Sequence, residues 1–165
     1  MIIESDEFYI GVVKPKDLNA VLAIYESNMD FVMHHTGCRD VTGAWLQSEL
    51  ETMKAAGFYS CKIVEKCSGN VIGIADFQIG DETYLSLLML HGAYQNKGLG
   101  KRVYRAIEEY AKSCGSARIR LDVVTNYDII VHSFWQSQGF IKIQDITLHW
   151  AGRDLPAVMM KKKLI

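Results

Sequence analysis

The chain has 165 residues, of which 49% are apolar and 22% charged, and only two are prolines. This composition is typical of one globular domain and excludes a disordered or collagen-like chain. Eighteen basic residues against nineteen acidic ones give a net charge of −1. No overall positive field would draw the protein to nucleic acid, so we expect no such partner.

The four cysteines form no CxxC pair and indicate neither a zinc site nor a disulfide framework. Reduced thiols are typical of the cytoplasm, and the acidic start of the chain does not resemble a signal peptide. The apolar run at residues 84–90 is far shorter than the ~20 residues that a membrane-spanning helix needs. We therefore expect a cytoplasmic protein with no membrane partner and no metal.

The first half of the chain predicts one strand and two helices. Residues 8–13 form the strand and begin a single domain over 8–165, with residues 1–7 as an N-terminal extension. Asp17 is placed to cap a helix whose apolar residues recur at helical spacing, and Thr42 is placed to cap a second one that ends at Gly57. Residues 28–41 show no regular pattern.

The second half changes to strand periodicity. Residues 58–90 are interrupted by two short turns and predict three antiparallel strands, the last apolar on both faces. A long helix from Leu99 to Gly115, a strand at 119–124, a short helix at 129–138 and two final strands follow. This order predicts an α+β domain with helices on both faces of a mixed, mostly antiparallel sheet.

The loop between the central strand and the long helix carries the strongest functional signal. At the start of a helix, free backbone N–H groups and the helix dipole attract an anion. Gly98 and Gly100 have no Cβ atom, which lets the backbone approach a phosphate closely. Positive charge stands beside them on Lys97, Lys101 and Arg102. We expect a ligand that carries a pyrophosphate.

Two better-known phosphate loops fit this segment poorly. A dinucleotide-binding loop needs a third glycine where Val103 stands. Such loops also belong to parallel sheets, whereas the loop here follows three predicted antiparallel strands. A P-loop needs Gly-Lys-Ser/Thr, whereas Leu99 follows Gly98. A tight strand-to-helix turn without a ligand remains open from the loop alone.

The wider sequence favours a ligand. Residues 90–100, LHGAYQNKGLG, closely resemble the acetyl-CoA signature of the GNAT N-acetyltransferase superfamily. Residues 133–140, SFWQSQGF, resemble its late helix, which ends in Gly-Phe. The resemblance implies a GNAT-like sheet splayed between its fourth and fifth strands, with acetyl-CoA as cosubstrate in the opening. It also implies transfer of the acetyl group to a primary amine, by direct attack in a ternary complex.

The resemblance assigns residues to this site by position. The backbone of Met89 and Leu90 would bind the pantetheine arm like an added strand. The pyrophosphate would be bound by the loop residues Gln95, Asn96, Lys97, Gly98, Leu99, Gly100 and Lys101. Asn126, Phe134 and Trp135 would flank the thioester end. The acceptor wall would contain Tyr25, Phe31, His34 and His35.

Three residues are candidates for the base that deprotonates the amine: Asp76, Glu82 and His91. Asp76 interrupts an apolar strand, on the face of Ile72, Ile74 and Gln78, so burial should raise the pKa of its carboxyl. Glu82 in a turn is equally explained as a solvated residue, and His91 as a local backbone contact.

Two features depart from the family pattern. Trp135 stands where relatives commonly have a tyrosine that protonates the leaving thiolate, and indole cannot transfer a proton at neutral pH. Asn126 also lies further from it than usual, and His132 is a possible relay. These departures keep an alternative open, a catalytically silent acyl-CoA-binding regulatory module. The sequence does not decide between a small-molecule and a peptide acceptor, and the resemblance allows a homodimer.

Overall fold

The computed structural model describes residues 2–165, which form one eight-stranded sheet with the order β1-β2-β3-β4-β5-β6-β8-β7. All neighbouring strands are antiparallel except β5 and β6, which are parallel. The strands are β1 (Ile3–Glu4), β2 (Phe8–Val12), β3 (Tyr59–Glu65), β4 (Val71–Gln78), β5 (Glu82–Leu90), β6 (Arg118–Val124), β7 (Ile141–Trp150) and β8 (Arg153–Lys163). The predicted α+β class is confirmed.

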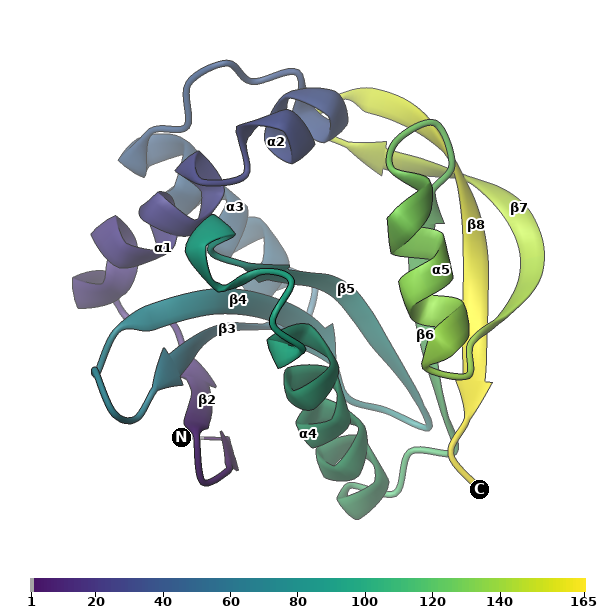
Figure 1. Ribbon diagram of the computed structural model, residues 1–165. Helices are drawn as coiled ribbons and strands as arrows, with labels where there is room; N and C mark the ends of the chain where they lie inside the picture. Colours follow the sequence, from purple (N-terminus) through teal and green to yellow (C-terminus); the bar gives the residue numbers. More distant parts are fainter. Residues whose placement is uncertain (1) are drawn as a thin grey trace.

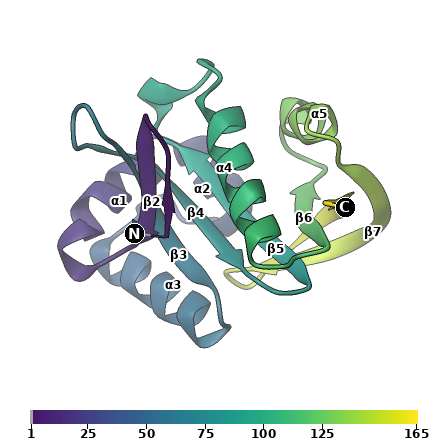
Figure 2. The same cartoon turned by 90° about the horizontal axis from the view of Figure 1, so that it is seen from below.

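Helices cover both faces of this sheet (Figures 1 and 2). They are α1 (Leu18–Glu26), α2 (Met29–Thr36), α3 (Gly43–Ala55), α4 (Leu99–Ser113) and α5 (Ile129–Ser137), with short 3-10 turns at Pro15–Asp17 and Gly92–Tyr94. The helices α1 to α3 pack on one face around Ile24, Val32 and Leu46. On the other face, α4 and α5 enclose the larger core with Tyr104 and Trp135. Among these helices, none is long and apolar enough to cross a membrane.

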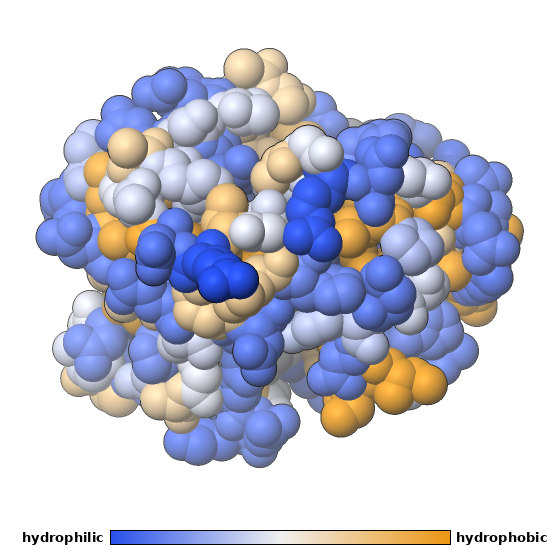
Figure 3. Space-filling view, turned by 90° about the horizontal axis from the view of Figure 1, so that it is seen from above, coloured by the Kyte–Doolittle hydropathy of each residue, from blue (hydrophilic) through white to orange (hydrophobic). Residues whose placement is uncertain are grey.

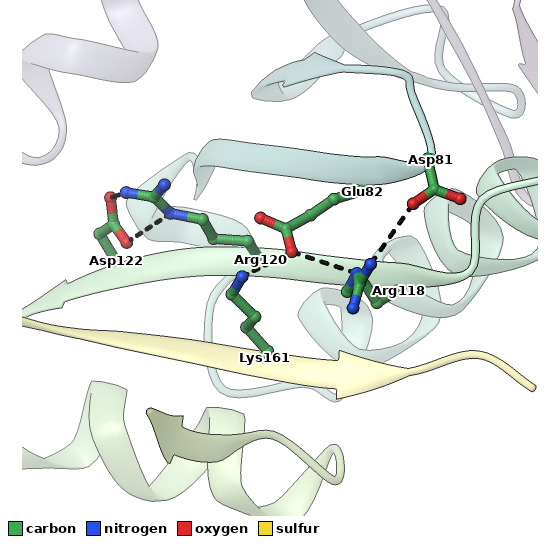
Figure 4. A network of polar contacts seen from close by, with 6 residues as sticks. All are labelled: Asp81, Glu82, Arg118, Arg120, Asp122 and Lys161. Atoms are coloured by element: carbon green, nitrogen blue, oxygen red, sulfur yellow. Dashed lines mark hydrogen bonds and ion pairs between the residues drawn. The ribbon is translucent and has the colours of Figure 1, made fainter. Parts of the chain in front are cut away.

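The sheet opens between β5 and β6. The two strands pair only from Glu82 to Tyr84 with Arg118 to Arg120, and then diverge although both continue (Figure 1). A charged network stands at the closed end (Figure 4), where Lys161 Nζ lies 2.6 Å from Glu82 Oε2 and Arg120 binds Asp122 through two nitrogens. The ion pairs of Glu82 with Lys161 and Arg118 join the two halves of the sheet at this end, whereas the Arg120–Asp122 pair lies within β6.

Residues 29–36, for which the sequence showed no pattern, form the helix α2. Its buried side includes His35 and Thr36, which hide the apolar spacing. Both side chains bind backbone carbonyls of the same helix: His35 Nδ1 lies 2.8 Å from the Phe31 oxygen, and Thr36 Oγ1 donates to Val32 at 2.7 Å. The sequence pattern missed this helix because polar residues stand on its buried face. They can be buried there because their side chains bond within the helix.

The capping predictions had different outcomes. Thr42 Oγ1 accepts the Trp45 N–H at 3.1 Å and caps α3 as predicted. Asp17 precedes α1 but makes no side-chain cap, because its carboxylate instead binds Lys62 Nζ at 2.8 Å and the Lys14 N–H at 2.8 Å. Residues 3–4 of the expected extension add an edge strand to the sheet, and Ile3 packs into the core.

Candidate functional site

The start of α4 presents unpaired backbone N–H groups of the kind that bind anions. Gly98, the N-cap, has a φ of 75°, a left-handed conformation that favours glycine. The first helical hydrogen bond runs from the Arg102 N–H to the Gly98 oxygen. Among the described residues, the N–H groups of Leu99, Gly100 and Lys101 find no acceptor in the protein. They converge with the positive end of the helix dipole, and a pyrophosphate fits this donor set.

Side chains fix the loop rather than extend it to a ligand. Gln95 Nε2 donates to Asn28 Oδ1 at 2.7 Å and to the Leu90 oxygen at 3.0 Å. Asn96 has a φ of 61°, which asparagine tolerates better than most residues. Lys97 Nζ donates to the Ala93 oxygen, and Arg102 forms an ion pair with Glu7 at 2.8 Å. The third cation predicted here, on Lys101, is the one that could turn to a ligand.

The free edge of β5 faces the opening. His91 N–H donates to the Ile72 oxygen, so in alternating order Met89 directs its N–H and C=O to β4, opposite Ile74. Leu88 and Leu90 direct theirs to the open edge. The Met89 backbone was expected to bind the pantetheine arm, but it is turned toward β4, and the backbone of Leu88 lies at the open edge in its place. The Leu90 carbonyl already accepts the Asn28 and Gln95 amides. Leu88 and the Leu90 N–H are the groups that an added strand could bind.

The far wall of the opening comes from α5. Phe134 lies beside the start of α4, where a Cβ added to Gly100 would be 3.8 Å from its ring. Trp135 is 8% exposed and packs edge-to-face on Tyr104, Phe134 and Phe140, so most of its indole belongs to the core. The small part that stays exposed lines the opening.

Aromatic residues join the two halves across the mouth of the opening. Asn126 Oδ1 lies 3.0 Å from His34 Nε2, which links the loop after β6 to α2. Phe31 stacks on His35 at 3.9 Å, and Tyr127 lies edge-on to both. Burial lowers the pKa of His35, whose Nδ1 must carry the proton because a carbonyl only accepts. His35 is therefore a neutral part of this wall.

Two cavities meet at the centre of the sheet. The β5–β6 cleft, about 120 Å³, lies between Leu85–Leu88 of β5 and Leu121–Val124 of β6. The Asp76 cavity, about 190 Å³, lies on the α1 and α3 side. They share Ser86, Leu87, Leu148 and Trp150. Figure 3, which looks onto the molecule from above, shows hydrophobic side chains between hydrophilic ones toward the β6–β8 half.

Asp76 lies at this junction. It pairs in register with Leu87, and a bulge follows at once, because Phe77 pairs with Leu85 and leaves Ser86 as the extra residue. A second bulge leaves Ile72 unpaired with β3, so Ile72 packs on the α4 face while Ile74 stays on the α1 face with Asp76. The sequence placed Ile72 and Asp76 on one face, and the bulge corrects this.

The surroundings of Asp76 bring the pKa of its carboxyl close to neutral pH. Burial raises the pKa of its carboxyl, the Ser60 hydroxyl opposes this rise and the nearby charge of Glu49 adds to it, which brings the pKa from 3.8 to about 7. Ser60 faces Asp76 across β3 and β4, and its buried Oγ makes no well-aligned hydrogen bond among the described residues. A carboxyl of this pKa exchanges protons readily at neutral pH.

The other base candidates lie elsewhere. Glu82 is bound to Arg118 and Lys161 at the closed end of the sheet. His91 Nδ1 accepts the Ala93 N–H at 3.0 Å, the local contact that its position suggested. His132 lies on α5, half-buried, and does not line either cavity. Of the predicted acceptor residues, Tyr25 lines the Asp76 cavity, whereas Phe31 and His35 line the β5–β6 cleft.

The lining residues that had not been singled out from the sequence include Glu49, Tyr84, Tyr127 and Trp150. Glu49 carries a weak signal, since it follows Leu46 by three residues and so interrupts the apolar stripe of α3. Trp150 Nε1 donates to Glu49 Oε2 at 3.0 Å, a contact between residues about a hundred positions apart that no local pattern reveals. Within residues 2–165, no group of three or more metal-binding side chains occurs.

A splayed mixed sheet with a bare helix start beside its opening defines the class of this protein, the GNAT acetyltransferase fold. The sequence profile described as "Acetyltransferase (GNAT) family" matches residues 22–140. The chain therefore belongs to the GNAT acetyltransferase family. A search of curated proteins found no significant match to the sequence.

Solved structures share this fold at low sequence identity. An acetyltransferase (GNAT family) from Bacillus anthracis is 16% identical with a TM-score of 0.78, and the alignment covers 99% of both chains. The yncA protein from Salmonella typhimurium, solved with its cofactor acetyl-CoA, is 21% identical with a TM-score of 0.64 over 97% of this chain and 95% of that one. PaiA N-acetyltransferase from Thermoplasma acidophilum, in complex with coenzyme A, is 18% identical with a TM-score of 0.66 over 94% and 98%.

Proposed function

We propose that this protein transfers the acetyl group of acetyl-CoA to a primary amine by direct attack within a ternary complex. The observation that carries the proposal is the meeting of two cavities at Ser86 and Leu87, one beside the free strand edge and one containing Asp76. A donor bound along β5 and an acceptor bound at Asp76 would come together there. Acetyl-CoA, when bound, supplies an activated thioester.

The protein would bind the donor through backbone. The N–H groups of Leu99, Gly100 and Lys101 would hold the pyrophosphate. Leu88 and the Leu90 N–H would bind the pantetheine arm as an added strand. Asn126, Phe134 and the exposed part of Trp135 would flank the cleft. All of these groups use main-chain or packing contacts, so loss of a single side chain should weaken binding less than a Cβ placed in the loop.

Asp76 would act as the base. Alkyl ammonium groups have a pKa near ~10, so the acceptor arrives protonated and must lose a proton before it attacks. The Asp76 carboxylate accepts that proton, and the neutral amine nitrogen then forms a bond to the acetyl carbon. As the carbon–sulfur bond breaks, the nitrogen loses its second proton to water, and the leaving thiolate takes up a proton from water. The thiol formed has a pKa of ~8.5, so protonation of the thiolate needs no acidic side chain and the tryptophan at 135 does not block turnover.

Release of free CoA thiol in the presence of amines tests this proposal. A panel should include small amines and peptides with free N-termini, and mass spectrometry should identify an acetylated product. Tight acetyl-CoA binding without release of thiol from any amine would instead support the silent regulatory module.

We also infer a soluble cytosolic setting and a homodimer, the latter through β7. This strand lies at the edge of the sheet, and its Ile141 and Ile143 are 66% and 47% exposed. Sedimentation of the protein and of an Ile141→Lys, Ile143→Lys variant tests the assembly, since a dimer through β7 should dissociate in the variant.

A further inference from the structure

The Asp76 cavity has an acidic and aromatic lining. Two carboxylates, Asp76 and Glu49, are close enough for the charge of Glu49 to raise the pKa of the Asp76 carboxyl. The pKa of the Tyr25 hydroxyl, which lies between α1 and the sheet, is raised mainly by burial. The charges of Asp76 and Glu49 raise it further. Aromatic rings complete the walls, supplied by Tyr25, Phe58, Tyr84 and Trp150.

The same cavity offers almost nothing to an anion. Among the described residues, His149 is the one lining side chain that can become cationic, and its Nδ1 is in contact with the Asp154 carboxylate. The nearby guanidinium of Arg120 is bound by both oxygens of Asp122 and lies over the Tyr84 ring at 4.8 Å. A carboxylate on the acceptor would therefore face Glu49 and Asp76 without a counter-ion.

The cavity also continues outward. It shares Leu50, Phe58 and Ser60 with a larger groove of about 540 Å³, lined by β2, α3 and β3. An acceptor with its nitrogen at Asp76 would place its body beside Phe58 and Leu50, which are apolar. The reacting end is confined and acidic, and the far end is open.

We infer, resting on the proposed function, that the acceptor is a cationic amine with an apolar or aromatic body and no carboxylate next to its nitrogen. Glu49 is the residue that sets this preference. It attracts the ammonium on entry, and it repels the α-carboxylate of a free amino acid. The aromatic rings add favourable contact with the cation. Amines and peptide-like N-termini fit this description, whereas free α-amino acids do not.

Three matched acceptors test the inference: phenethylamine, phenylalanine amide and phenylalanine. They share the aromatic body and a primary amine, and the amide has nearly the shape of the amino acid without its negative charge. Because the amide is the less basic amine, the rates are compared per concentration of neutral amine. We expect the kcat/KM of CoA release to be at least about tenfold higher for the amide and for phenethylamine than for phenylalanine. Equal values for phenylalanine and its amide would overturn the inference and leave the proposed function intact.

A charge-removing variant assigns the preference to Glu49. Glu49→Gln keeps an oxygen to accept the Trp150 indole N–H, so the wall should retain its shape. The variant should narrow the amide-to-acid ratio severalfold, mainly through KM. Glu26→Gln is the matched control, since Glu26 is exposed on α1 and lines neither cavity, and its ratio should equal that of the wild type. An unchanged ratio in Glu49→Gln, in a protein that melts like the wild type, would refute the role of Glu49. If no amine of a wider panel is acetylated, the proposed function fails and the inference fails with it.

Discussion

Replacing Asp76 with asparagine should stabilise the protein while it removes the base. The pKa of this carboxyl is 3.8 in the unfolded chain and about 7 in the fold, so the unfolded state gives up its proton first as the pH rises. The free energy of unfolding therefore falls between pH 4 and 7 and stays low above pH 7. A pKa difference of about 3, at ~1.36 kcal/mol for each pH unit, gives a cost of about 4 kcal/mol as an upper bound.

The asparagine side chain would carry no charge and would not experience this cost. Urea unfolding at pH 7.5 should show Asp76→Asn to be about 2–4 kcal/mol more stable than the wild type, and the two proteins should converge near pH 4. The groups around position 76 include Glu49 of α3, Tyr25 of α1, Ser60 of β3, Tyr84 of β5 and His149 of β7. They are unchanged in the variant, so the difference between the two proteins isolates this carboxyl.

The same variant should lose activity. General bases contribute about a hundredfold or more, so kcat/KM at pH 7 should fall by roughly that factor. The wild-type rate should rise through a pKa near 7 and level off, whereas the variant should keep rising toward the pKa of the free amine. A variant that is less stable than the wild type at pH 7.5, or that keeps the wild-type pH profile, would refute the assignment of Asp76.

The phosphate loop, the indole of α5 and the buried ion pair each allow a further test. Gly100→Val should weaken acetyl-CoA binding by at least about tenfold in calorimetry. Its melting temperature should change little, because a Cβ at this position meets Leu90 and Phe134 at ordinary distance. Gly98→Val is a poorer test because the φ of 75° at Gly98 adds strain, and wild-type affinity in both variants would disprove the anion site. Trp135→Ala should destabilise the protein by about 3–5 kcal/mol through the cavity that it leaves among Tyr104 and Phe140, whereas Trp135→Tyr should bind acetyl-CoA normally and preserve or raise turnover; a collapse of turnover in the tyrosine variant would reveal a specific role for the indole. Lys62→Met should lower the free energy of unfolding in urea by about 3 kcal/mol at pH 7, since it leaves the Asp17 carboxylate buried without its cationic partner. Burial raises the pKa of Asp17, but the pairing with Lys62 and the other contacts of this carboxylate lower it overall, so the lost stability should shrink as the pH falls below 4. An equal loss at pH 3 would exclude the ion pair as its cause.

Local sequence patterns predicted most of the elements because helix and strand periodicity, caps and turns act between near neighbours. Thr42 and the three residues that follow it are sufficient to begin α3, and Gly98 next to a helical stripe is sufficient to predict a bare helix start. The helix α2 escaped detection because its buried face contains His35 and Thr36, whose polar atoms are satisfied within the helix itself.

The order of the elements, the phosphate loop and the unusual position of Asp76 could all be predicted from the chain, since each depends on residues that are consecutive or regularly spaced. The contacts around these features were decided only by the tertiary structure. A bulge at Ile72 of β4 puts Ile72 and Asp76 on opposite faces of the sheet, and strand alternation turns Leu88 rather than Met89 to the open edge. The pairing of Trp150 with Glu49 joins β7 to α3, far apart along the chain. Such contacts depend on register and on the angle at which β5 and β6 separate, and those are set by the packing of the whole sheet.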